Sequence, residues 1–99
     1  MAKLIFRQEA IDDLNNIWCY TFEKWSEKQA DKYYETLKFG CKQIVDNPSL
    51  GKKYDTINSN LLGLKIGKHI IFYQCVNEHE VEIIRILHER MDRLSRLSE

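Results

Sequence analysis

Two stretches of helical hydrophobic periodicity stand side by side in the first half of this sequence, with room for only a very short turn between them. In residues 9–25, apolar side chains recur at spacings of three and four, as on one face of an amphipathic helix. The same spacing returns after Ser26, which has a glutamine three residues later in the pattern of a capping box and is predicted as the N-cap. It ends at Asn47 and Pro48, because proline disfavours a helical conformation for the preceding residue. The sequence therefore predicts an antiparallel αα-hairpin. Six residues lie along one side of the first predicted helix: Ala10, Leu14, Ile17, Trp18, Thr21 and Trp25.

The rest of the chain is rich in β-branched and aromatic residues. Residues 3–6 predict a short strand before the hairpin, and residues 48–60 predict a loop after it. Three further strands are predicted at 62–67, 69–76 and 81–87, the last two joined by a tight connection at 77–80. We expect an α+β fold in the order β-α-α-β-β-β, with the N-terminal strand and the αα-hairpin packed on an antiparallel sheet. Residues 88–99 predict a short C-terminal helix or arm.

Length and charge restrict what such a chain can be. The 99 residues suit one domain spanning 1–99, because a second independent core would not fit. Lys and Arg number 15 and Asp and Glu number 15, which argues against a broad phosphate-binding surface. No apolar stretch approaches the roughly 18 to 20 residues that span a bilayer. We therefore expect a cytoplasmic protein that contacts neither membrane nor, outside a complex, nucleic acid.

The candidate metal ligands and thiols have simpler interpretations. Cys19, Cys41 and Cys75 are odd in number and form no CxxC pair, so we expect reduced, mostly buried thiols rather than disulfides or a zinc site. Asp12 and Asp13 are adjacent on a predicted helix, and adjacent helical positions do not converge on one ion. They predict a solvated first turn. No metal and no cofactor is expected.

The most concentrated set of reactive side chains follows the last predicted strand. In a functional interpretation, His88 is a general acid or base while Arg85 and Arg90 hold a phosphate, as in a metal-independent ribonuclease. In a structural interpretation, His88, Arg90 and Asp92 fasten the end of the strand through charge-assisted hydrogen bonds. The residues alone favour the structural interpretation, and they leave both open.

Aromatic residues gather on the predicted hairpin. They are expected first in the core and in the seam between the two helices. Those that remain exposed would form an interaction patch, because large apolar patches on small proteins commonly mark partner sites. The residues are Trp18, Phe22, Trp25, Tyr33 and Tyr34.

The order of elements and several local motifs resemble a known family. The motifs are Ala10 with Asp13-Leu14 and Ile17, Asn47-Pro48 with Gly51, the run from Gly67 to Tyr73, and the run from Ile84 to Asp92. Together they resemble ParE toxins of the ParE/RelE superfamily, the toxic halves of type II toxin–antitoxin systems. The last run is the most specific, because an Arg-Ile-Leu-His-x-Arg-Met-Asp segment after a β-hairpin separates the ParE branch from its ribonuclease relatives.

The resemblance implies a toxin that inhibits DNA gyrase by binding, without turnover, and that a cognate ParD-like antitoxin neutralises. It implies a C-terminal target-binding segment, which on this sequence comprises His88, Arg90, Met91, Asp92, Arg93 and Arg96. The antitoxin would use the apolar hairpin face, with Trp18, Phe22, Trp25, Tyr33 and Tyr34.

Two alternatives stay open at this point. One is a RelE-like, ribosome-dependent mRNA endoribonuclease that uses His88 with Arg85 or Arg90. Against it, His69 stands where those enzymes commonly have an arginine, and no tyrosine follows Tyr73. The other is an inactive toxin-like module that serves in autoregulation with its antitoxin.

Overall fold

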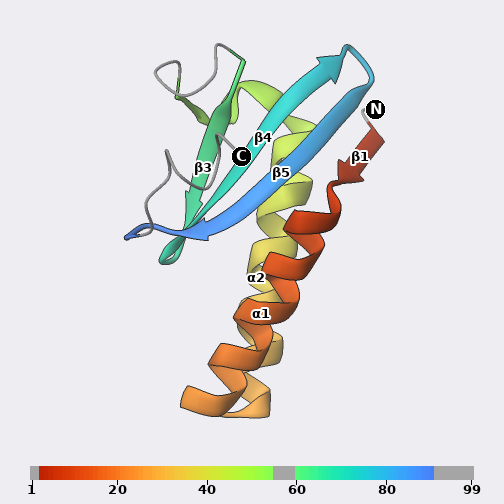
Figure 1. Cartoon of the computed structure of the whole chain (residues 1–99). Helices are drawn as coiled ribbons and strands as arrows, with labels where there is room; N and C mark the ends of the chain where they lie inside the picture. The colour runs from red at the N-terminus through yellow and green to blue at the C-terminus, as the bar shows by residue number, and fades with distance from the viewer. Residues whose placement is uncertain (1–2, 55–59, 91–99) are drawn as a thin grey trace.

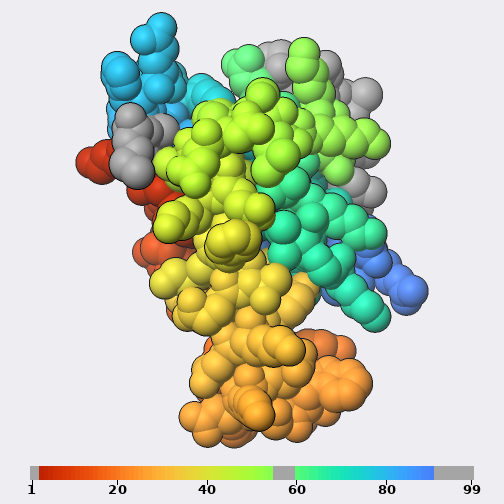
Figure 2. All heavy atoms as spheres, turned by 180° about the vertical axis from the view of Figure 1, so that it is seen from behind, coloured from red at the N-terminus to blue at the C-terminus, as the bar shows by residue number. Residues whose placement is uncertain are grey.

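The two predicted helices are present and pack on one face of a sheet (Figure 1). The structure, a computed structural model, describes residues 3–54 and 60–90. Helix α1 spans Gln8–Lys24 and helix α2 spans Glu27–Asp46. Seen from the opposite side, α2 crosses the sheet and the turn between the helices projects well beyond it (Figure 2). None of the described helices is long and apolar enough to cross a membrane.

The sheet has five strands in the order β1-β5-β4-β3-β2. They are β1 (Lys3–Phe6), β2 (Lys52–Lys53), β3 (Leu62–Ile66), β4 (His69–Asn77) and β5 (Glu80–His88). The α+β fold and the order β-α-α-β-β-β are confirmed. The structure adds two features to the expected antiparallel sheet. Strand β1 pairs with β5 in parallel, and the predicted loop after α2 contains a short 3-10 helix, η1 (Pro48–Leu50), followed by β2.

The helix boundaries follow from local chemistry. The Ser26 hydroxyl accepts a hydrogen bond from the Gln29 N–H at 3.1 Å, which satisfies one of the unpaired donors at the start of α2. Pro48 stops α2 at Asp46 and opens η1, where its fixed φ angle is tolerated. The predicted tight connection between β4 and β5 is also present, and Asn77 Oδ1 accepts the His79 N–H at 2.8 Å.

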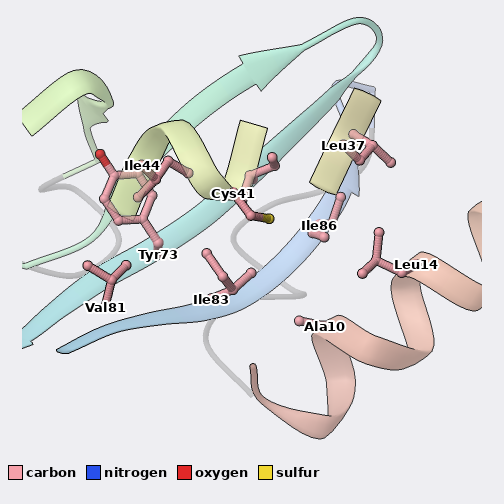
Figure 3. Packing of buried hydrophobic residues seen from close by; sticks show 10 residues of the cluster. Ala10, Leu14, Leu37, Cys41, Ile44, Tyr73, Val81, Ile83 and Ile86 are labelled. Carbon is pink, nitrogen blue, oxygen red and sulfur yellow. The ribbon is translucent and has the colours of Figure 1, made fainter. Parts of the chain in front are cut away.

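The main core lies between the helices and the sheet (Figure 3). Its members are Ala10, Leu14, Leu37, Cys41, Ile44, Ile71, Tyr73, Val81, Ile83 and Ile86. Tyr73 brings a hydroxyl into this core and satisfies it fully: it donates to the Pro48 carbonyl at 2.7 Å and accepts the Gly51 N–H at 2.8 Å. The buried tyrosine thereby fixes the segment that follows α2 against the sheet.

The other face of the sheet is also apolar. Tyr54 packs against a second cluster there and meets Phe72 edge-on, with ring centroids 5.1 Å apart. The cluster comprises Leu61, Ile70, Phe72, Ile84 and Leu87. Strands buried on both sides read as continuous apolar runs, which explains why β4 and β5 show little alternation in the sequence. The pairing is irregular at Ile84, because Phe72 pairs with Arg85 while Tyr73 pairs with Ile83.

Three expectations from the sequence are wrong in detail. Asp13 is not solvated: only 11% of its side chain is exposed, and its carboxylate binds β5. Trp25, expected on the buried side of α1, is 76% exposed because the helix ends one residue before it. Of the three thiols only Cys41 is buried, whereas Cys19 and Cys75 are exposed. Helical and strand periodicity place a residue on a face, but they do not say how far the neighbouring element extends over it.

The Asp13 carboxylate joins α1 to β5 with three hydrogen bonds. It accepts two from the Arg85 guanidinium at 2.9 and 3.0 Å and one from the Ile86 N–H at 2.9 Å. Both side chains of the ion pair are mostly buried, with 18% of Arg85 exposed. Such a pair is costly to break from one side, because the remaining charge keeps its desolvation penalty.

We predict that Asp13→Ala lowers the free energy of unfolding by about 3 kcal/mol, because it removes the carboxylate acceptor of a mostly buried guanidinium and of a backbone N–H. Urea unfolding followed by circular dichroism would measure the loss. Asp12→Ala is the matched control, since Asp12 is exposed on the same helix and accepts a hydrogen bond from the exposed side chain of Gln8; it should cost less than about 0.5 kcal/mol. Equal losses in the two variants would contradict this assignment.

Candidate functional site

The end of β5 carries a cluster of polar side chains from three elements. His88, the last residue of β5, pairs in register with His69, the first residue of β4. Their rings meet edge to face, with centroids 5.3 Å apart and an interplanar angle of 83°. From α2, the Tyr33 hydroxyl lies 2.6 Å from His69 Nδ1. A helix and two strands therefore meet at these three side chains.

Tyr33 also holds the turn between β3 and β4. Its hydroxyl accepts the Lys68 N–H at 3.2 Å, and its ring lies against Gly67. Gly67 has a positive φ of 58°, and a Cβ there would approach the Tyr33 ring to 2.9 Å. Only glycine suits both the backbone conformation and the close contact. Tyr33 is thus a structural part of this end of the sheet.

The chain leaves β5 under several restraints. His88 Nδ1 accepts the N–H of Arg90 at 3.1 Å. The Glu89 N–H donates to the Lys68 carbonyl at 2.9 Å, and the Glu89 carboxylate meets Lys65 Nζ at 2.8 Å. The Lys65 side chain is 63% exposed, so this last pair contributes little. The backbone bonds are the firmer restraint.

Two members of the cluster, His69 and Tyr33, are uncharged at pH 7. The pKa of His69 is lowered to about 4, chiefly by burial, and a charge on His88 would lower it further. The carboxylates of Asp13 and Glu89 act in the opposite direction. Burial also raises the pKa of Tyr33 above its ordinary value, while its bond from the Lys68 N–H opposes the shift. Tyr33 therefore keeps its proton, and its hydroxyl shares a short hydrogen bond with His69 Nδ1 whose direction is set by the tautomer of His69.

The residues of the ribonuclease hypothesis are only partly brought together. His88 and Arg90 are joined by the bond from the Arg90 N–H. The Arg85 guanidinium instead points to α1, where both oxygens of Asp13 hold it. Phosphate binding by Arg85 would have to break a mostly buried ion pair. Of the predicted target-binding residues, Met91, Asp92, Arg93 and Arg96 lie outside the described residues.

A second candidate surface lies on the helical hairpin. Two open depressions of about 480 and 210 Å³ run between α1 and α2 and share Asn15 and Tyr34 in their linings, so they form one groove. Trp18 lines the larger depression and spans both helices, since its Nε1–H donates to Asp31 Oδ1 at 2.9 Å. The remaining lining residues are Cys19 and Glu35 in the larger depression, and Phe6, Ile11, Leu14 and Lys38 in the smaller.

Exposed aromatic side chains extend the groove toward the turn of the hairpin. Phe22 stacks on Trp18, with ring centroids 5.3 Å apart, and is 47% exposed. With Ile11, which is 39% exposed, Trp18 and Phe22 form a stripe along α1, because spacings of seven and four return to one side of a helix. Trp25 follows directly after the end of α1 and is 76% exposed. Of the five predicted antitoxin-binding residues, Trp18 and Tyr34 line the groove, Phe22 stacks on Trp18 and Trp25 lies at the turn of the hairpin, while Tyr33 belongs to the end of the sheet.

Comparison with known proteins identifies the family. A sequence model described as "ParE toxin of type II toxin-antitoxin system, parDE" matches residues 4–93. The chain belongs to the ParE toxin family. It is the toxin of a type II toxin–antitoxin system, as the resemblance of its motifs implied.

Curated relatives carry the same name. Toxin ParE1 of Mycobacterium tuberculosis is 33% identical over 79 residues, which cover 80% of this chain and 81% of that protein. Toxin ParE1 of Caulobacter vibrioides is 31% identical over 85 residues, which cover 86% of each. Among solved structures, the chromosomal ParDE toxin–antitoxin system from P. aeruginosa matches with a TM-score of 0.77 and 20% identity, over 89% of this chain and 96% of that one. That structure shares the fold of this ParE toxin.

No set of three or more metal-ligating side chains converges within residues 3–54 and 60–90 of the toxin. The sequence does not predict the link from Tyr33 through His69 to His88, although His69 begins one predicted strand and His88 follows the next. Nothing in the sequence places Tyr33 beside them, since it lies 36 residues before His69. The predicted strand register could have paired the histidines, but the position of α2 required the structure.

The low pKa of His69 predicts a pH-dependent stability for this ParE toxin. Between pH 4 and about 6.5 the unfolded chain binds a proton at His69 that the folded chain does not, so the free energy of unfolding falls as the pH falls through this window. The contribution should be on the order of 1 kcal/mol between about pH 7.5 and pH 5, because solvent screens a histidine that is only partly buried. Urea unfolding at several pH values would measure it.

Carboxylates also titrate in acid, so the loss of stability at low pH has more than one source. Two variants separate the part that is due to His69. His69→Asn should remove this part of the pH dependence, since asparagine does not titrate. His79→Asn, at an exposed position in the β4–β5 turn, should leave it as in the wild type. The prediction fails if wild type and His69→Asn lose stability in parallel.

Proposed function

We propose that this ParE toxin inhibits DNA gyrase by binding, without turnover, and that a cognate ParD-like antitoxin neutralises it in the cytoplasm. The observation that carries the antitoxin part is the continuous open groove on the hairpin, with exposed aromatic side chains along it. Exposed apolar surface of this kind favours a protein partner. An amphipathic helix could lay its apolar face in such a groove.

The geometry favours inhibition by binding over RNA cleavage. A ribonuclease would need basic side chains free to hold a phosphate, yet Asp13 holds Arg85 in a mostly buried ion pair. His88 Nδ1 is engaged by the Arg90 N–H, and the neighbouring His69 stays neutral. The proposed target-binding residues are His88, Arg90, Met91, Asp92, Arg93 and Arg96.

The groove suits an antitoxin tail that orders as it binds. Such a tail can cover a large part of a small protein, because it folds over the surface on binding. Asp31 and Glu35 at one end of the groove and Lys38 at the other would orient the tail by charge. Binding to the folded toxin alone would also stabilise it by mass action.

Purified toxin in a gyrase supercoiling and cleavage assay, with and without antitoxin, tests the proposal. Inhibition with trapped cleaved DNA, relieved by antitoxin, is the expected result. Transcript cleavage on ribosomes without any effect on gyrase would support the ribonuclease alternative. Folded toxin that binds antitoxin and leaves both targets unaffected would identify an inactive module.

The arginines of the C-terminal segment yield the first functional prediction. Replacing Arg90, Arg93 and Arg96 together with alanine should reduce gyrase inhibition by at least about 30-fold, because arginines at a buried interface commonly carry much of its energy. Retained antitoxin binding and an unchanged unfolding curve would show that the variant is folded. Full growth arrest by such a folded variant would refute the assignment.

The groove yields the second functional prediction. Phe22→Ser and Trp25→Ser should each weaken antitoxin binding by about 10-fold or more in calorimetry, because each removes an exposed aromatic anchor. Phe39→Ser is the matched control: Phe39 is 60% exposed and lies on α2, whereas Phe22 stacks on Trp18, which lines the groove. An antitoxin that loses equal affinity for all three variants, or for none, would not be using this groove.

A further inference from the structure

We propose that His88 supports toxicity as a positioning residue, which fixes the backbone at Arg90 and is itself held in place by His69 and Tyr33. In this view the three side chains set the direction in which the chain leaves the end of β5 at Arg90. The inference rests on the proposed function, since it assumes that the C-terminal segment contacts the target. It gives His88 a different role from a general acid or base.

The hydrogen bond that defines this role is local. His88 Nδ1 accepts the N–H of the residue two positions later, Arg90, at 3.1 Å. Asparagine side chains commonly make the same bond in turns, and this chain contains an example: Asn77 Oδ1 accepts the His79 N–H at 2.8 Å. An acceptor at this position bends the chain immediately after the strand. His88 thus acts on the backbone as a turn residue does.

The neighbouring side chains restrict the His88 ring. His69 packs against it edge to face at 5.3 Å, and the Tyr33 hydroxyl holds His69 at 2.6 Å. Tyr33 lies on α2, which is fixed to the sheet by fully buried Leu37 and Ile44. The position of the His88 ring is therefore fixed relative to the core of the domain by two contacts, that of His88 with His69 and that of His69 with Tyr33.

The backbone of Lys68 closes the arrangement. Its N–H donates to the Tyr33 hydroxyl at 3.2 Å, and its carbonyl accepts the Glu89 N–H at 2.9 Å. The β3–β4 turn is thus joined to α2 on one side and to the end of β5 on the other. Two consecutive N–H groups after β5, those of Glu89 and Arg90, have defined acceptors.

The same geometry argues against proton transfer by His88. Nδ1 can accept the Arg90 N–H only while it is unprotonated, so protonation there would break the bond that fixes the chain. A general acid or base must gain and lose a proton in each turnover. His69, at 2.6 Å from Tyr33, is likewise occupied by a structural bond.

A rescue experiment separates the two roles. His88→Leu should lower gyrase inhibition and growth arrest by about 10-fold, since the Arg90 N–H loses its acceptor. His88→Asn should recover most of that loss, to within about threefold of wild type, because its side-chain oxygen can accept the same N–H but cannot act as an acid or base at neutral pH. Tyr33→Phe should lower both readouts by about threefold to fivefold.

Two further measurements make the test decisive. The Arg90 amide resonance, followed by NMR in each variant, should shift in His88→Leu and return toward its wild-type position in His88→Asn. Antitoxin binding should be unchanged in both His88 variants, because Trp18 and the rest of the groove are intact. Loss of inhibition in His88→Asn equal to that in His88→Leu would overturn the proposal, as would an unmoved Arg90 amide in His88→Leu.

Failure of the proposed function gives a different pattern. A wild-type protein that arrests growth without inhibiting gyrase would refute the gyrase target, and the ordering of the variants in growth arrest would then decide the positioning role. A folded wild-type protein that neither inhibits gyrase nor arrests growth would overturn both proposals.

Discussion

The arrangement of the helices on the sheet depends on the hydrogen bonds that the Asp13 carboxylate accepts from β5. Strand β1 covers the outer edge of β5 only from Glu80 to Ile83, and the chain then turns into α1. Beyond that point Asp13 accepts the Ile86 N–H and the Arg85 guanidinium, so a helix side chain satisfies the backbone where no strand pairs with it. An exposed edge of that kind would invite pairing with another chain. One residue thus closes an edge and fixes the hairpin on the sheet.

Much of this fold could be predicted from the sequence, because each element has a strong local signal. The Ser26 cap and the stop at Pro48 set the bounds of α2, and runs of β-branched residues mark β4 and β5. The parallel pairing of β1 was not predictable in this way, since β1 pairs with a strand that begins some 77 positions later at Glu80. The two-residue β2 has no periodicity to detect.

The candidate sites were predictable in composition but not in arrangement. The aromatic residues of the hairpin could be proposed as a patch, yet whether Tyr33 or Tyr34 would face the groove depends on the rotation of α2 about its axis. Adjacent helical residues point about 100° apart, so one of them lines the groove and the other reaches the β3–β4 turn. Likewise Arg85 carried a plausible phosphate-binding role until its partner, 72 residues earlier, was placed.

Helix α2 therefore contacts both candidate surfaces through neighbouring residues. Coupling between two sites requires an element with two arrangements, and α2 does not offer one: Leu37, Cys41 and Ile44 are at most 1% exposed in a closely packed core, which resists small displacements. Glycine at position 40 lets Ile66 and Ile71 approach the helix so closely that a Cβ there would lie 2.9 Å from Ile66. A partner that binds in the groove would therefore contact a helix that its buried side chains hold in place. For the proposed neutralisation by an antitoxin, this packing favours covering the toxin surface over rearranging the residues at the end of β5.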